Sequence, residues 1–198
     1  MSEDIYHTLG KHLSALGMGY PDKEELIDIL KANFTALEAE IALGIPTGVI
    51  PFAPVAVDLI AEKLKMSPEK IAPVLDNLAQ RGLLFSGKLA DGTTGYALNQ
   101  FGHGFPQTFF WGGIDTPEAK SAAEMLVRYS KLPDLEKAYG ETASKAFRFL
   151  PVIPSLDPDS HAVFPFEMME EVVNRVSRIA LVHCPCRATT ELLGRRQC

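Results

Sequence analysis

Cysteine is absent from most of this 198-residue sequence, and the three that occur are Cys184, Cys186 and Cys198. An odd number of cysteines, two of them one residue apart, is a poor disulfide framework and is typical of a reducing cytoplasm. Apolar runs long enough to cross a bilayer are lacking too, and the acidic start Ser2-Glu3-Asp4 does not suit a signal peptide. We therefore expect a cytoplasmic protein with no membrane partner.

Catalytic motifs are also lacking. The sequence has no phosphate-binding loop, no nucleophile elbow and no convincing set of Ser, His and Asp residues. Enzymatic activity therefore has no support from motifs, and the question of catalysis stays open at this stage.

The overall composition is that of a globular chain long enough to bury a proper core, with 46% hydrophobic and 22% charged residues. The net charge of −6 is unevenly spread. Residues 22–100 hold eleven Asp or Glu against seven Lys or Arg, whereas residues 172–198 hold five arginines and one glutamate. The body is acidic and the cysteine-bearing end is basic, which bears on the partners of each part.

Helices are predicted at the start of the chain. An amphipathic helix is expected over about residues 3–16, and a longer one from Asp22, its N-cap, to about Leu43, where Gly44 stops it. The apolar residues of the longer helix recur at three- and four-residue intervals, which predicts one buried face: Leu26, Ile29, Leu30, Phe34, Leu37 and Ile41. Residues 44–54, rich in Pro and Gly, form an apolar connector.

The segment from Val57 to Leu98 carries the clearest pattern. A helix with apolar residues Val57, Leu59, Ile60 and Leu64 is followed by Ser67-Pro68-Glu69, a helix start signal, and by a second helix up to Arg81-Gly82. Strands are predicted over 83–85 and 96–98, with a turn over 90–95. The run "LIAEKLKMSPEKIAPVLDNLAQRGLL" resembles the winged-helix family, and the resemblance covers residues 21–99.

A winged helix commonly binds DNA through its second helix, which requires a basic surface. Here the outward positions of that helix are mixed, with two acids, one lysine and a proline: Glu69, Lys70, Pro73, Asp76, Asn77 and Gln80. The wing offers only Lys88 against Asp91. Charge therefore disfavours DNA as a partner, and a scaffold or partner-docking domain is the preferred interpretation.

Both helices and strands are predicted after residue 100. An aromatic, glycine-rich loop or short helix is expected over 101–113, a capped helix over 116–131 and a short helix over 134–139. A strand over 147–153, a helix over 167–176 and a strand over 178–182 should follow, the last delivering Cys184. The predicted fold class is therefore α+β and helix-rich, with a small α/β region that ends in a Cys-x-Cys strand-loop.

The cysteine end has three interpretations. Most zinc sites space their cysteines by two to four residues, so the single residue between Cys184 and Cys186 suits an iron–sulfur cluster better, since two thiolates can ligate different iron atoms. Arginines at 187, 195 and 196 would lower thiolate pKa values and offset the charge of a cluster. A Cys3His zinc site and inert buried thiols remain as alternatives.

Residues 147–198 resemble a family in which a winged-helix-like domain precedes a Cys-x-Cys-Arg segment, a further cysteine and ferredoxin-type 4Fe-4S motifs. The residues that carry the resemblance are Pro165, Glu167, Ile179, Cys184, Cys186, Arg187, Gly194 and Cys198. It implies that Cys184, Cys186 and Cys198 ligate a 4Fe-4S cluster. Because no Cys-x-x-Cys-x-x-Cys run occurs, we expect an N-terminal part of such a protein with an incomplete site, whose fourth ligand could be His183, another subunit or further sequence.

The sequence therefore predicts three regions: a winged-helix-like domain over 1–100, a helical connector over 101–146 and the start of an iron–sulfur region over 147–198. The expected function is electron transfer or an accessory redox role with a redox protein partner, rather than catalysis. The alternative is a winged-helix transcriptional regulator whose cysteine end senses redox state or metal. Zinc is the alternative metal, and a homodimer is left open.

Overall fold

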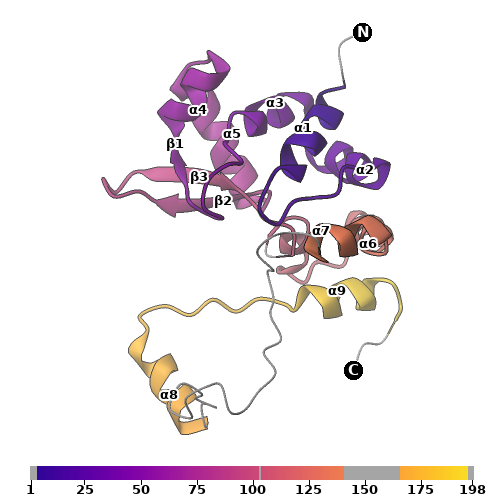
Figure 1. The fold of residues 1–198 in the computed structure, drawn as a ribbon. Helices are drawn as coiled ribbons and strands as arrows, with labels where there is room; N and C mark the ends of the chain where they lie inside the picture. The colour runs from indigo at the N-terminus through magenta and orange to yellow at the C-terminus, as the bar shows by residue number, and fades with distance from the viewer. Residues whose placement is uncertain (1–3, 103, 141–165, 196–198) are drawn as a thin grey trace, which may run out of the picture.

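A computed structural model describes residues 4–102, 104–140 and 166–195 of the chain. Within these ranges the protein is rich in helix and carries a three-stranded antiparallel sheet (Figure 1). The expected α+β class is confirmed at this level. Among these residues, no helix combines the length and the apolar character that a membrane span requires.

Three helices begin the chain: α1 (Ile5–Ser14), α2 (Glu24–Asn33) and α3 (Ala36–Leu43). The prediction of one helix over 22–43 was wrong, because the chain breaks at Phe34 and Thr35. Phe34 is buried with an extended backbone, and Thr35 begins α3 with a capping box in which it exchanges hydrogen bonds of 2.7 and 3.3 Å with Glu38. The capping box of Thr35 and Glu38 thus starts a second helix, even though the helical spacing of apolar residues continues through this point.

Two details of this region also differ from the prediction. The N-cap of α2 is Lys23 rather than Asp22, so the helix starts later than expected. Leu37, assigned to the buried face of one long helix, is 48% exposed. The break at Thr35 restarts the helical period, so a position extrapolated from α2 no longer faces the core.

The sheet and its two helices follow the predicted order. They are β1 (Val55–Ala56), α4 (Val57–Leu64), α5 (Pro68–Gln80), β2 (Leu84–Lys88) and β3 (Thr94–Leu98). Strand β3 lies between β1 and β2 and pairs antiparallel with both; its Tyr96 is opposite Val55 on one side and Ser86 on the other. The short β1 was not predicted, and Leu59, assigned to a buried face, is 59% exposed.

The core joins these helices to the sheet through buried leucines, isoleucines and aromatic rings. Tyr20 lies at its centre: the hydroxyl donates toward the carbonyl oxygens of Asn99 at 2.9 Å and Phe105 at 2.6 Å. The Tyr20 ring packs edge-on against Phe101, with centroids 5.4 Å apart. This residue therefore ties the loop before α2 to the segment that follows β3.

The connector contains the 3-10 helix η1 (Gln107–Phe110) and the helices α6 (Pro117–Ser130) and α7 (Pro133–Gly140). All three confirm the sequence expectation for 101–139. Thr116 caps α6 by accepting a hydrogen bond of 3.2 Å from the backbone N–H of Ala119. Tyr129, buried on α6, donates to the carbonyl oxygen of Pro21 at 2.9 Å, which fastens this helix to the N-terminal body.

The C-terminal part holds α8 (Phe166–Arg175) and α9 (Pro185–Leu192), joined by a chain without regular structure (Figure 1). Helix α8 agrees with the prediction, whereas the strand predicted over 178–182 was wrong. Within the part of the chain that the structure describes, those residues pair with no strand, and Leu181 is 93% exposed. The strand predicted over 147–153 lies outside the described residues.

Candidate functional site

The first turn of α9 presents two of the three cysteines. Cys184 is the N-cap, Pro185 is the first helical residue and Cys186 is the second, and both cysteine side chains are exposed. Proline suits this position because the first helical N–H has no partner within the helix. The predicted Cys-x-Cys strand-loop is thus corrected to a helix N-terminus, where backbone N–H groups point outward from the helix end.

The helix start changes the chemistry of Cys184. No standard side-chain capping hydrogen bond forms there, but the backbone N–H of Arg187 faces the sulfur and lowers the pKa of the Cys184 thiol. The backbone N–H of Cys186 and the charge of Arg187 lower this pKa further. Each of these groups favours the thiolate, which is the form that binds metals. An exposed thiol with a lowered pKa is therefore available to a ligand.

Helix α9 is held against the body of the protein by contacts with η1 and α6. The backbone N–H of His183 donates to the carbonyl oxygen of Trp111 at 2.9 Å. Gly113 has a φ of 62°, and a side chain there would meet the His183 ring at 2.5 Å, so the ring packs directly on the glycine backbone. The first turn of α9, which carries both cysteines, is therefore anchored by the contacts of His183 just before it.

Sequence reasoning missed α9, although it contained the signals for a helix. Pro185 follows an N-cap position, and Leu192 and Leu193 lie near the end of the helix and pack against the core. Gly194 then ends it with a φ of 66°, and the N–H of Arg195 donates to the carbonyl oxygen of Thr190 at 2.8 Å.

The full ligand set is not brought together by the described residues. Cys198 lies outside them, as does Arg196, while Arg187 and Arg195 are exposed. His183, the candidate fourth ligand, does not form a group of three metal-binding side chains with Cys184 and Cys186 in the described ranges. The assignment of Cys184, Cys186 and Cys198 as cluster ligands stays a prediction.

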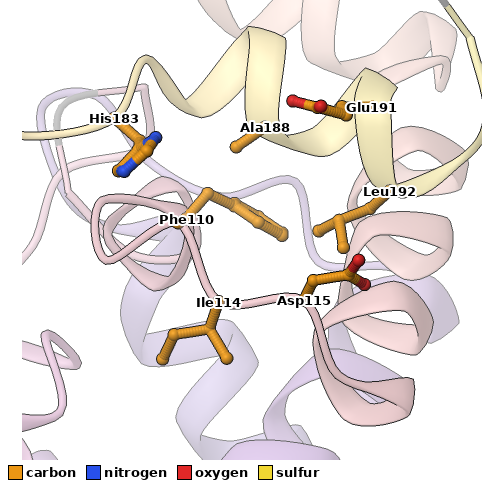
Figure 2. A pocket seen from close by; sticks show the side chains of 8 residues that line it. Phe110, Ile114, Asp115, His183, Ala188, Glu191 and Leu192 are labelled. Atoms are coloured by element: carbon orange, nitrogen blue, oxygen red, sulfur yellow. The ribbon is translucent and has the colours of Figure 1, made fainter.

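A cavity of about 310 Å³ lies next to the cysteine turn (Figure 2). Its lining comes from η1, the segment that leads into α6, and α9; the residues are Phe110, Gly113, Ile114, Asp115, His183, Ala188, Glu191 and Leu192. Figure 2 shows His183 at one end of the cavity and the carboxylates of Asp115 and Glu191 toward the other. Sequence analysis did not anticipate this cavity because its walls are distant in the chain.

The exposed face of α5 agrees with the sequence-based assignment. Its outward positions are exposed as predicted: Glu69, Lys70, Pro73, Asp76, Asn77 and Gln80. Asp76 accepts a hydrogen bond from Tyr96, and burial, together with this carboxylate, raises the pKa of Tyr96 to about 12.

Arg81, the arginine nearest to this face, is engaged within the protein. Its guanidinium forms an ion pair with Glu38 at 2.6 Å and hydrogen bonds with Asn77 and the carbonyl oxygen of Asn33. A phosphate group would have to compete with these contacts for the arginine. The Arg81 guanidinium is therefore held by contacts within the protein.

Comparisons of this chain with protein-family models, with curated proteins and with solved structures found no match.

Proposed function

We propose that this chain belongs to an iron–sulfur protein that transfers electrons, with Cys184, Cys186 and Cys198 as thiolate ligands and a redox protein as partner. The observation that carries the proposal is the pair of exposed thiols on the first turn of α9, one of them with a lowered pKa. Thiolates at such a position bind soft metals and clusters. The odd number of cysteines supports a reducing cytoplasm as the compartment.

The two described cysteines fit a cluster in their donor chemistry and exposure. Cys184 and Cys186 are separated by a rigid proline, and both sulfurs are open to solvent, so each could ligate a different iron atom. Backbone N–H groups at the start of α9 would hydrogen-bond the sulfurs, and Arg187 would offset their negative charge. When bound, a 4Fe-4S cluster supplies reversible one-electron storage.

The N-terminal body serves in this proposal as a winged-helix scaffold that docks a partner. The support is its element order, α3-β1-α4-α5-β2-β3, with the sheet order β1-β3-β2 and a hairpin as the wing. DNA binding is the alternative function of such a domain. Since Arg81 is engaged within the protein and the α5 face is mixed in charge, the described residues favour a protein partner.

The test is the metal content of the protein purified without oxygen. Because these cysteines supply only part of the expected ligand set, iron and acid-labile sulfide in similar amounts, with a visible absorption band, are expected from the full-length protein that contains this chain. Cys184→Ala and Cys186→Ala should each remove most of this absorption, while Ser177→Ala, a change at an exposed position between α8 and α9, should leave it intact. Zinc in the absence of sulfide would indicate a structural zinc site instead of a cluster. A protein without metal whose thiols titrate freely would rule out both kinds of site.

The alternative function needs its own measurement. A winged-helix regulator should shift a duplex from its own promoter region at low salt, with binding that weakens steeply as salt rises. Binding of this kind that is lost in Lys70→Gln and Lys88→Gln variants would favour the regulator. Its absence at low salt leaves the docking scaffold as the explanation.

A further inference from the structure

Strand β2 forms one edge of the sheet, and its outer side is open. The sheet order β1-β3-β2 leaves β2 paired with β3 on one side only. Among the described residues, no other segment forms a backbone hydrogen bond with Leu84–Lys88. The one charged side chain of the strand, Lys88, stands at its end. An open edge of this kind is a template for a further strand.

A groove of about 480 Å³ lies beside this edge and has exposed aromatic rings on its walls. Phe85, on β2, is 38% exposed and packs edge-on against Phe52, with ring centroids 5.6 Å apart. Trp111, which follows η1, lines the same groove and is 42% exposed. Large apolar side chains that gather at one place on a surface often mark a site of protein interaction.

Two polar side chains in the groove are already engaged within the protein. Asn99 and Thr108 both donate to the carbonyl oxygen of Gly82, at 2.9 and 2.6 Å. Their hydrogen-bonding capacity is therefore partly used, and the exposed aromatic rings are the main surface on offer. The groove thus suits the apolar side chains of an extended segment that pairs with β2.

The C-terminal arm, residues 166–195, carries an apolar segment of this kind. Within residues 178–182, the side chains of Ile179, Leu181 and Val182 are exposed, and among the described residues this segment pairs with no strand. It has the same length as β2, five residues. In an extended strand Ile179 and Leu181 would lie on one face, so both could contact the aromatic rings beside β2.

The position and charge of the arm favour a second copy of the chain as the occupant. Figure 1 shows α8 and the chain that follows it standing apart from the sheet, while the backbone N–H of His183 is held at Trp111. Residues 172–182 contain two arginines and no acid, whereas residues 22–100 have an excess of acids. An extended basic arm therefore suits the acidic body of another copy.

We propose that the chain forms a homodimer by reciprocal exchange of arms, in which residues 178–182 of each copy add to the open edge of β2 in the other and Leu181 enters the groove lined by Phe85 and Trp111. Backbone hydrogen bonds supply part of the affinity, and the groove selects apolar side chains. Two identical contacts close the dimer, so it does not extend into a filament. The interface does not depend on a bound cluster.

The test is sedimentation of the whole chain over a range of concentrations, with a reductant present so that the exposed cysteines do not cross-link. A monomer–dimer equilibrium is expected. Leu181→Asp should raise the dimer Kd about a hundredfold, because two leucine contacts worth about tenfold each are lost. Leu59→Asp, an exposed position on α4 that does not line the groove, is the control and should leave the Kd unchanged.

Two results of this experiment would overturn the proposal. One is a chain that stays monomeric at about 1 mM, a concentration at which even weak contacts are populated. The other is a dimer that Leu181→Asp weakens no more than Leu59→Asp does.

A mixing experiment tests the reciprocal arrangement. Phe85→Ser removes a ring from the groove and should by itself weaken the dimer as Leu181→Asp does. A mixture of the two variants should dimerise only about tenfold more weakly than the unchanged chain, because the intact groove of one variant receives the intact arm of the other. No gain on mixing would indicate that the arms pair with each other, which contradicts the proposal.

Amide hydrogen exchange identifies the occupant, and it stands even if Phe85→Ser misfolds. In the dimer, exchange should be slow over residues 178–182 and at the β2 amides that β3 does not bond. Dilution to the monomer, or Leu181→Asp, should speed up both together. Slow exchange of these β2 amides in the monomer would assign the groove to the arm of the same copy. A dimer in which they exchange fast would place its interface elsewhere, and either result contradicts the proposal.

Discussion

The body formed by residues 4–102 and the C-terminal arm, residues 166–195, differ in how far their apolar side chains are covered by other elements. In the body, a large set of apolar side chains is buried to within a few per cent, although some, such as Leu37 and Leu59, are exposed. In the arm, Val176, Ile179, Leu181 and Val182 are exposed, and among its described elements α9 packs on the rest of the protein, through η1 and α6. The contrast teaches that the apolar pattern of a segment predicts its structure only where other elements of the chain are present to cover it.

The sharpest way to test this comparison is to remove the same side chain from each region. Leu75→Ala in α5 takes away a fully buried side chain and should lower the free energy of unfolding by about 2–5 kcal/mol. Leu181→Ala removes an exposed leucine and should change it by less than about 0.5 kcal/mol. Urea denaturation of dilute protein, in which the chain is a monomer, measures both.

A large loss of unfolding free energy in Leu181→Ala would contradict this difference between the two regions. It would mean that the arm is covered even in dilute solution and that its exposed residues belong to an interface. A sedimentation experiment on the same sample would then tell whether a second copy provides that cover.

Tyr20→Phe tests the centre of the body with a smaller change. The variant keeps the ring but leaves the carbonyl oxygens of Asn99 and Phe105 without the hydroxyl donor. The expected loss is about 1–3 kcal/mol, the cost of an unsatisfied buried polar group. Thermal unfolding of this variant beside Tyr6→Phe, whose hydroxyl donates to the carbonyl oxygen of Phe34 in a half-buried position, gives the matched control.

Gly113→Ala tests the junction between the two regions. An alanine there is strained at a φ of 62° and its methyl group would strike the His183 ring, so α9 should loosen from η1. The backbone strain alone costs about 1–2 kcal/mol. Hydrogen exchange should speed up at the His183 amide, with little change in α5; Gly112→Ala, where an added carbon meets only ordinary contacts, is the control. Unchanged exchange at His183 would disprove the anchoring role of the glycine.

The smallest expected effect concerns the acidity of the Cys184 thiol in metal-free protein. Its lowered pKa means that alkylation should reach half its maximal rate at a pH below 9.0, the ordinary value for this thiol. Arg187→Gln removes the positive charge and should move that midpoint upward, but not fully, since the backbone N–H of residue 187 remains and is the main cause. Mass spectrometry of alkylated peptides from chains treated over a range of pH measures the change.

Prediction from sequence succeeded where a local signal sets an element and failed where the element depends on partners elsewhere in the chain. Ser67-Pro68, Thr116-Pro117 and the alternating apolar residues between Val57 and Leu98 are local signals, and the elements they predict occur with bounds shifted by a few residues. The break at Thr35 was missed although its capping box is visible in the sequence, because the apolar period runs through it. The strand predicted over 178–182 failed because a strand requires hydrogen-bonding partners, which no local pattern guarantees.

The sequence by itself determined that the chain is helix-rich, that its body is acidic and that its thiols gather at one basic end. Those properties follow from composition and local periodicity. Only the tertiary structure decided that His183 rests on Gly113 and that Asp115 faces the same cavity as Glu191. These pairings join residues distant in the chain, and packing fixes them through burial and shape that no single segment contains.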